Sequence, residues 1–273
     1  MQYLIWNIRQ TNGEMELMTT KRGYCHICGE LTDLTFEHIP PRKALNNVST
    51  KIYSGVDILK NKQTNKLDDT IGLRYQNQQR GAGRYTLCSR CNNNTGAYYA
   101  PHYIEFALSV AYMLKQEKIT EAVGTHLETK EMNCLAVFKQ IISMFCSTSS
   151  SDTFAFEFKD FLLNKESTQF DRERWGVYLY VNVGSRSGTS GMITLFYKQK
   201  EKELAEPPSI LTVRVGEIIT YPLGMVLFDR RSQHQPDQIG LDITEMSSIP
   251  YGKKPHTIMD LPYHDKAVFM PGI

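Results

Sequence analysis

Apolar residues recur at helical spacing in two parts of the chain. One helix is predicted from the second of two Cys-x-x-Cys pairs to residue 114, with Pro101 kinking or restarting it. A second helix is predicted over 133–146, because one face collects the apolar residues Leu135, Phe138, Ile141, Ile142 and Phe145. The pattern therefore predicts two helices in the middle of the chain.

Beyond residue 150 the helical spacing gives way to short apolar runs. These runs are rich in β-branched and aromatic residues and are separated by Gly and Pro, as is typical of strands and turns. Strands are predicted at 177–183, 192–197, 210–215, 218–221 and 225–228. We expect an α+β protein whose second half is mostly β.

Both ends of the chain lie outside these blocks. Apolar runs at 3–6 and 15–18 flank the turn-forming Thr11-Asn12-Gly13 and predict a hairpin. Four prolines near the C-terminus predict an extended tail on the surface. The expected order is a hairpin arm, a first domain, a helical connector, a β-rich domain and a tail, over 1–21, 22–115, 116–149, 150–245 and 246–273.

The composition excludes two classes of protein. A hydrophobic content of 41% and a charged content of 22% are ordinary for a globular chain and exclude a mainly disordered one. The longest apolar stretch, 106–114, falls far short of the ~20 residues that span a bilayer, and no secretory signal begins the chain. We therefore expect a cytoplasmic protein without a membrane partner.

Positive charge is concentrated in one segment. Residues 42–91 contain ten Lys or Arg and three Asp, whereas the whole chain is only +2. Within this segment, the polar and amide-rich residues 46–83 are expected to form an insert that ends at Gly81-Ala82-Gly83. A local excess of cations suits a surface for a polyanion, but a solvated lysine-rich insert would have the same charge.

Four of the six cysteines form two Cys-x-x-Cys pairs. Cys25 and Cys28 make the first pair, and Cys88 and Cys91 make the second, with 59 residues between them. Duplicated spacing of this kind favours a four-thiolate structural Zn²⁺ site over four buried free cysteines. Such a site would close a large loop and bring distant segments together.

An acid and an imidazole lie side by side between the two cysteine pairs. Glu37 and His38 cannot point the same way on an extended strand, so one could bind a metal while the other faces a water or substrate. Asn92 directly follows the last cysteine, so the zinc site would hold it near the strand of Glu37. Two such oxygen ligands suit Mg²⁺.

Together these motifs resemble the HNH endonuclease family, in the subgroup braced by a four-cysteine zinc. The resemblance rests on Cys25/Cys28, on Glu37-His38-Ile39-Pro40-Pro41, and on Cys88/Cys91-Asn92, and it covers roughly residues 22–115. It implies a fold with a β-hairpin followed by a helix, called ββα-metal. The expected fold class is therefore a zinc-braced ββα-metal nuclease domain, then helices and a mostly β domain.

The resemblance also implies roles for individual residues. His38 would be the general base that activates water for attack on a phosphodiester, and Glu37 and Asn92 would hold a catalytic Mg²⁺ or Mn²⁺. The stretch 83–87 lacks the asparagine that normally orients the imidazole, so a backbone carbonyl or Asn77 is expected to do so. Phosphates of the substrate are expected to contact Arg42, Lys43, Arg84 and Arg90.

Function is expected to be hydrolysis of DNA, with restriction or anti-phage defence suggested by analogy alone. Two alternatives stay open, namely a catalytically silent zinc-stabilised nucleic-acid-binding protein and a nuclease directed at RNA. One site per chain suggests a homodimer for double-strand cutting. The β-rich domain is expected to select a substrate or bind a regulatory partner.

Other histidines and cysteines carry weaker signals. His26, inside the first cysteine pair, is expected to be exposed in a loop. His102 is expected on a helix face, with a place near the metal as the less favoured interpretation. Cys134 and Cys146 are expected only to pack in the core.

Overall fold

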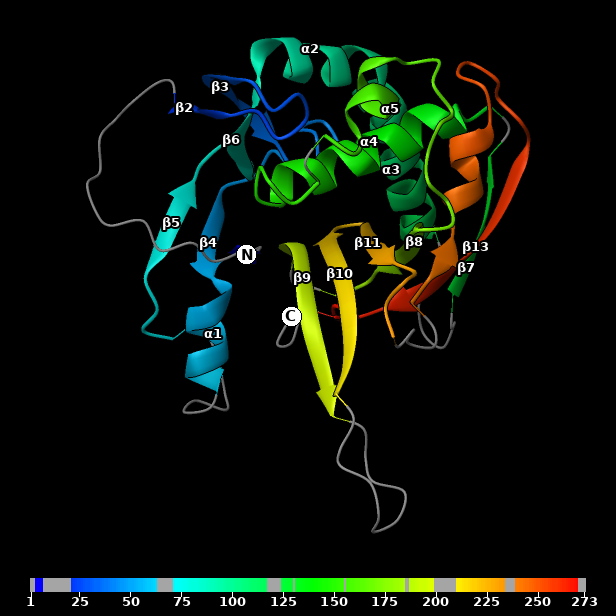
Figure 1. Cartoon of the computed structure of the whole chain (residues 1–273). Coiled ribbons are helices and arrows are strands. Elements are labelled where there is room, and N and C mark those ends of the chain that lie inside the picture. Colours follow the sequence, from blue (N-terminus) through cyan, green and yellow to red (C-terminus); the bar gives the residue numbers. More distant parts are fainter. Residues whose placement is uncertain are drawn as a thin grey trace, which may run out of the picture.

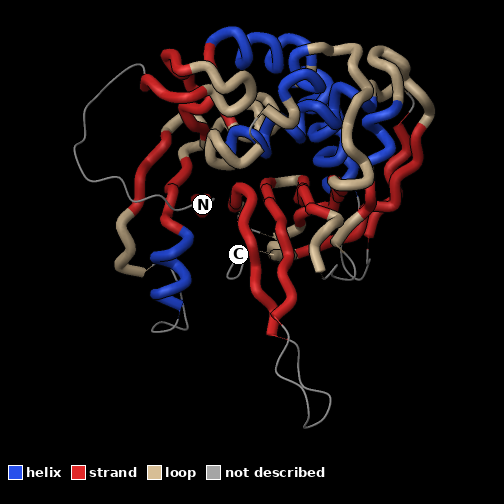
Figure 2. The backbone as a smooth tube through the Cα atoms, in the orientation of Figure 1, coloured by secondary structure: helices blue, strands red, loops and turns tan. Residues whose placement is uncertain are grey.

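The fold is a mixed α+β arrangement in which helices cover one side of a large sheet (Figure 1). The computed structural model describes residues 3–6, 21–62, 71–116, 124–129, 131–154, 156–184, 187–198, 210–233 and 239–269. The described strands form three separate sheets, and the helices other than α1 (Gly55–Lys62) gather above the largest of them (Figure 2). No helix of this described part is long and apolar enough to cross a membrane.

The two predicted helical regions are confirmed. The first consists of α2 (Ser89–Tyr98) and α3 (Ala100–Gln116), and Pro101 lies in the first turn of α3, where its missing N–H costs nothing. The second is α4 (Cys134–Thr148), which begins where the Asn133 side chain accepts the Ala136 N–H at 3.2 Å. All residues of α4 are buried, so this helix lies inside the molecule and not on its surface.

The large sheet has seven strands. Its main path runs β7-β13-β8-β11-β10-β9, and β12 pairs with β8. The predicted strands at 210–215 and 218–221 are one continuous strand, with a register shift between Val215 and Glu217. The strand bounds are β7 (Gly124–Thr129), β8 (Trp175–Asn182), β9 (Gly188–Lys198), β10 (Ile210–Thr220), β11 (Leu223–Asp229), β12 (Leu241–Asp242) and β13 (Thr257–His264).

The prediction of a surface tail over 246–273 is wrong for its described part. A 3-10 helix at Thr244–Ser248 is followed by β13, which pairs antiparallel with β7 and parallel with β8. Met259 and Leu261 are buried, whereas Ile258 and Asp260, which alternate with them, are exposed. This alternation is that of a half-buried strand, and the neighbouring prolines conceal it in the sequence.

A smaller sheet carries the cysteine pairs. Strands β2 (Lys21–Tyr24), β3 (Leu31–His38) and β6 (Gly83–Cys88) pair antiparallel in the order β2-β3-β6. Helix α2 follows β6 directly and contacts both β3 and β6. We call these three strands with α2 the cysteine-braced sheet. Two antiparallel strands followed by a helix is the arrangement that the resemblance implies, although it does not by itself confirm the HNH fold.

The basic insert folds into an arm that extends from the body (Figure 1). It contains strand β4 (Thr50–Ser54), the short helix α1 (Gly55–Lys62) and strand β5 (Tyr75–Gln78), which pairs antiparallel with β4. On the other side of β4 lies β1 (Tyr3–Trp6), in parallel. The predicted N-terminal hairpin would pair 3–6 with 15–18, and the latter residues lie outside the described ones.

One hydrophobic core joins both halves of the chain. It runs from Cys25 in the cysteine-braced sheet through α3 and α4 to Leu261 in β13, and it includes the short helix α5 (Lys159–Leu163). The expected boundaries at 115 and 150 therefore do not separate two cores. A second cluster packs Tyr53 and Ile58 of the arm with residues of the large sheet.

Candidate metal centre and the strand beside it

The two cysteine pairs meet, as their spacing predicted. The ligand atoms of Cys25, Cys28, Cys88 and Cys91 all lie within 4.8 Å of one another, and all four residues are buried. Tetrahedral zinc with Zn–S bonds of ~2.3 Å separates its sulfurs by roughly 3.8 Å. The Sγ atoms of Cys28 and Cys88 are 3.8 Å apart. The group could therefore bind a structural metal such as zinc.

Backbone N–H groups point at the sulfurs of this cluster. The Cys88 N–H donates to Cys25 Sγ at 3.3 Å, and the Cys91 N–H donates to Cys88 Sγ at 3.4 Å. Gly29 closes the first loop with a φ of +72°, which suits glycine, and its N–H donates to the Cys25 carbonyl. A hydrogen bond with the Cys91 side chain lowers the pKa of Cys25 to about 4. A thiolate at this position is ready to bind a cation.

Glu37 points into the molecule. Only 6% of the residue is exposed, and its Oε2 accepts a hydrogen bond from Ser147 Oγ at 2.5 Å. Burial raises the pKa of Glu37 to about 8, despite that hydrogen bond. The carboxyl group therefore faces the end of α4 instead of solvent.

His38 points the other way, as strand alternation requires. It is half-buried, and its Nε2 lies 3.1 Å from the Arg80 carbonyl. A carbonyl can only accept, so Nε2 carries the proton and Nδ1 is left unprotonated. Burial lowers the pKa of His38, which favours the neutral ring. Asn77, the other expected orienting group, instead accepts from Ser49 Oγ at 3.1 Å.

Asn92 lies against the strand of Glu37, as predicted. Its Nδ2 donates to Thr35 Oγ1 at 2.9 Å and to the Phe36 carbonyl at 3.2 Å. Mg²⁺ keeps several waters when bound, which requires ligands open to solvent. The buried carboxyl of Glu37 does not meet this requirement, so Glu37 and Asn92 do not fit a Mg²⁺ site in this arrangement. Among the described residues, the four cysteines alone form a group of at least three His, Cys, Asp or Glu suited to a metal.

The four arginines and lysines expected to hold phosphates fall into two pairs. Arg42 and Lys43 are exposed just after the two prolines. Arg84 and Arg90 are each bound to another group of the protein. Arg84 Nη1 donates to the Thr148 carbonyl at 3.3 Å, and burial lowers the pKa of Arg84 to about 9. Arg90 forms an exposed ion pair with Glu30 at 2.8 Å.

His26 lies in the loop of the first cysteine pair, as expected, but the expectation that it is exposed is wrong. It is half-buried, and its Nδ1 lies 3.1 Å from the Cys146 carbonyl at the end of α4. Burial lowers the pKa of His26 accordingly. The first cysteine loop is thereby tied to the helix whose Ser147 holds Glu37.

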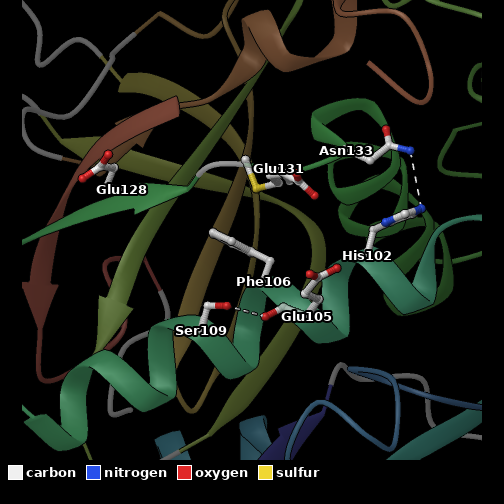
Figure 3. Close-up of a pocket in the computed structure, with 8 residues that line it drawn as sticks. His102, Glu105, Phe106, Ser109, Glu128, Glu131 and Asn133 are labelled. Carbon is white, nitrogen blue, oxygen red and sulfur yellow. Dashed lines mark hydrogen bonds between the residues drawn. The ribbon is translucent and has the colours of Figure 1, made fainter. Parts of the chain in front are cut away.

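His102 lies in a separate cavity, which Figure 3 shows. The cavity has a volume of about 190 Å³, and none of the four cysteines lines it. His102 Nε2 is 3.4 Å from Asn133 Nδ2. Two carboxylates of the lining are paired, because Glu128 contacts His256 at 2.7 Å and Glu131 contacts Lys254 at 4.0 Å. The favoured interpretation of His102 as a helix-face residue agrees with this position.

Comparisons with known proteins identify no relative: no family model, curated protein or solved structure matches the chain. Sequence reasoning missed the Ser147 hydroxyl on Glu37, because the two residues lie 110 positions apart in the chain. A backbone carbonyl was one of the two groups expected to orient His38, and it is that of Arg80, in the four-residue connection between β5 and β6. Residue type alone could not indicate which carbonyl this would be.

Proposed function

We propose that this protein is an endonuclease that hydrolyses phosphodiester bonds of DNA, with His38 as its general base. The observation that carries the proposal is the orientation of His38, whose Nε2 contacts the Arg80 carbonyl and whose Nδ1 is left as a proton acceptor. The resemblance of the surrounding motifs to HNH endonucleases supports the same role. A pKa lowered by burial keeps this acceptor neutral at the pH of the cytoplasm.

In the proposed reaction His38 Nδ1 takes a proton from a water whose oxygen attacks the phosphorus. The bond from phosphorus to the 3′-oxygen breaks, and the leaving oxygen takes up a proton from solvent. Arg42 and Lys43, exposed close along the chain, would hold phosphates of the same strand. General-base catalysis of this kind contributes typically ~10²–10⁴-fold to a rate.

The residues present fit a structural zinc but not a catalytic Mg²⁺. Zinc at the four cysteines would be structural, because it would fix β3, β6 and α2 around His38. The resemblance also implies Mg²⁺ or Mn²⁺ at Glu37 and Asn92. Because the buried Glu37 does not fit that ion here, no step is assigned to it.

The burial of Glu37 favours a second candidate, a zinc-stabilised nucleic-acid-binding protein without cleavage activity. In that case the hydrogen bond from Ser147 makes Glu37 a structural link between β3 and α4. A nuclease directed at RNA is a third outcome, because the same base could act on either sugar.

The first experiment is nicking of supercoiled plasmid DNA by the purified protein in Mg²⁺, in Mn²⁺ and without added divalent metal, with RNA as a parallel substrate. We expect nicking of DNA, at a rate at least about 100-fold lower in His38→Ala than in the wild type. His102→Ala, in the separate cavity, is the matched control and should cut like the wild type. Equal cutting by His38→Ala would contradict the proposed base.

Glu37→Gln separates the two candidates. Glutamine keeps the length of the side chain and an acceptor for Ser147, so the melting temperature should change little. If Glu37 binds a catalytic metal after rearrangement, this variant loses nicking while it stays folded. A wild type that binds plasmid but leaves it intact in every metal would instead support the binding protein.

A further inference from the structure

Strand β5 presents an exposed aromatic ring on the arm. It is the edge strand of its sheet, next to β4, and Tyr75 at its start is 50% exposed. Tyr53 lies opposite Tyr75 in the register, is buried, and has its ring centroid 5.7 Å away. The buried Tyr53 ring supports the Tyr75 ring from one side, while the other side of Tyr75 stays accessible. We call this exposed Tyr75 ring on β5 the platform.

A cation already lies on this ring. Lys51 Nζ is 4.4 Å from the centre of the Tyr75 ring, so the ring attracts positive charge in a cation–π contact. Arg74 precedes Tyr75, and Arg80 follows the strand after one more residue of turn. Both arginines are exposed.

The electrostatic character of this region fits a polyanion. On the arm, residues 50–61 and 71–80 have four Lys or Arg, namely Lys51, Lys60, Arg74 and Arg80, against one carboxylate, Asp57. Phosphates brought to such a surface release counterions, which provides affinity without sequence preference. Charge complementarity therefore identifies nucleic acid as the occupant of the arm.

An exposed tyrosine among cations distinguishes between forms of nucleic acid. In a continuous duplex the bases are stacked on each other and cannot reach a flat protein ring. An unpaired base can stack on an aromatic side chain while lysine and arginine contact its backbone. A base on Tyr75 would displace the Lys51 ammonium from the ring to the adjacent phosphate.

We propose that β5 binds an unpaired DNA base by stacking on Tyr75, so that the substrate contains a single-stranded region beside the bond that is cut. The distance follows from the chain. Tyr75 lies five positions before Arg80, whose carbonyl contacts His38, and five residues of fully extended chain span at most ~18 Å. With ~3.4 Å per nucleotide along one strand, the unpaired base lies within about five nucleotides of the cut. Both the choice of DNA as the ligand and the distance to the cut rest on the proposed function.

Binding is tested apart from cleavage, by fluorescence anisotropy in buffer without chelator and without added Mg²⁺ or Mn²⁺, with a labelled 20-nucleotide DNA, both single-stranded and as a duplex. We expect the wild type to prefer the single strand, and Tyr75→Leu to bind it roughly tenfold more weakly, because each stacked base contributes substantially to such affinities. Duplex binding should change less than twofold. Tyr75→Phe keeps the ring and should bind like the wild type, and so should Tyr112→Leu, which alters an exposed tyrosine of α3.

The possible results distinguish base stacking on Tyr75 from nuclease activity. Equal losses on single strand and duplex, or no loss in Tyr75→Leu, would overturn the stacking role. A protein that prefers single strands through Tyr75 but never cuts would overturn the proposed nuclease and leave the platform standing. If the wild type binds neither DNA, both the platform and the nucleic-acid function fail.

Discussion

The cysteine-braced sheet and the large sheet are held together by different forces. In the large sheet every residue of β8 and β11 is buried, so apolar side chains stabilise it from both faces. In β3 only Leu34 and Glu37 are buried, and the part of the core that lies beside the strand includes the four cysteines of the cluster. A sheet that depends on thiols can keep polar side chains on its strands. This difference explains why the acid, the imidazole and the amide of the candidate site all belong to the smaller sheet.

The largest expected effect comes from breaking the cysteine cluster. Cys91→Ala removes one thiol of the four, and structural zinc contributes roughly 10 kcal/mol or more to the folding of small zinc modules. We expect the variant to lose bound zinc and to unfold in the cysteine-braced sheet well below the melting temperature of the wild type. Zinc content and thermal melting measure the two effects, and chelation of the wild type should reproduce them.

Cys134→Ala is the matched control for that variant. Cys134 is also a buried free cysteine, but it lies outside the cluster and contacts the Met132 carbonyl. Its loss should cost about 1 kcal/mol and leave the zinc content unchanged. If Cys91→Ala kept its zinc and melted like Cys134→Ala, the four thiols would not be a metal site.

A smaller loss of stability is expected from a cavity in the large sheet. Leu261 of β13 is fully buried, so Leu261→Ala should lower the free energy of unfolding by about 2–5 kcal/mol in urea titration. Ile258→Ala, three residues earlier on the same strand but 54% exposed, should cost much less. Similar small losses in both variants would mean that β13 lies on the surface, as the proline-containing sequence first suggested.

The smallest effect concerns α4, the helix between the two sheets. Lys139 is fully buried, and its Nζ donates to the carbonyls of Asn164 at 2.7 Å and Lys165 at 3.0 Å. Burial lowers its pKa from 10.5 to about 7, although Glu166 opposes this shift. Between these values the unfolded chain holds more protons, so raising the pH from 7 towards 10.5 stabilises the native protein through this group, by at most about 1.4 kcal/mol per pH unit.

Lys139→Met tests that slope. The free energy of unfolding of both proteins is measured at several pH values above 7, and the difference between them reports on Lys139 alone. We expect the wild type to gain stability relative to Lys139→Met as the pH rises. A constant difference would show that the buried ammonium titrates normally.

The sequence predicted the local features of this molecule better than the distant ones. Periodic apolar residues were enough to predict α4, and duplicated cysteine spacing was enough to bring four thiols together. The hydrogen bond from Ser147 to Glu37 joins residues 110 positions apart, and the contact of His38 with Arg80 joins residues 42 apart. Such contacts depend on how elements pack, so no local pattern reveals which face of β3 is covered.

The large sheet was missed at its edge for the same reason. β7 is short and has Leu127 as its only large apolar residue, and its described partner, β13, lies far along the chain. Neither strand carries a run of apolar residues long enough to be recognised alone. Each strand is stabilised by its pairing with the other, which neither sequence reveals on its own.

The position of β13 between β7 and β8 has a consequence for biosynthesis. When β7 leaves the ribosome, the strand that will pair with it has not been translated, and β8 is made long before its parallel neighbour arrives. In a nascent chain that ends before residue 257, the backbone N–H and C=O groups of β7 that pair with β13 would therefore be unpaired. Leu127, which is buried in the folded protein, would be more exposed. Translation pausing or truncation in this stretch would leave a substrate for chaperones, even though every helix of the core had already been synthesised.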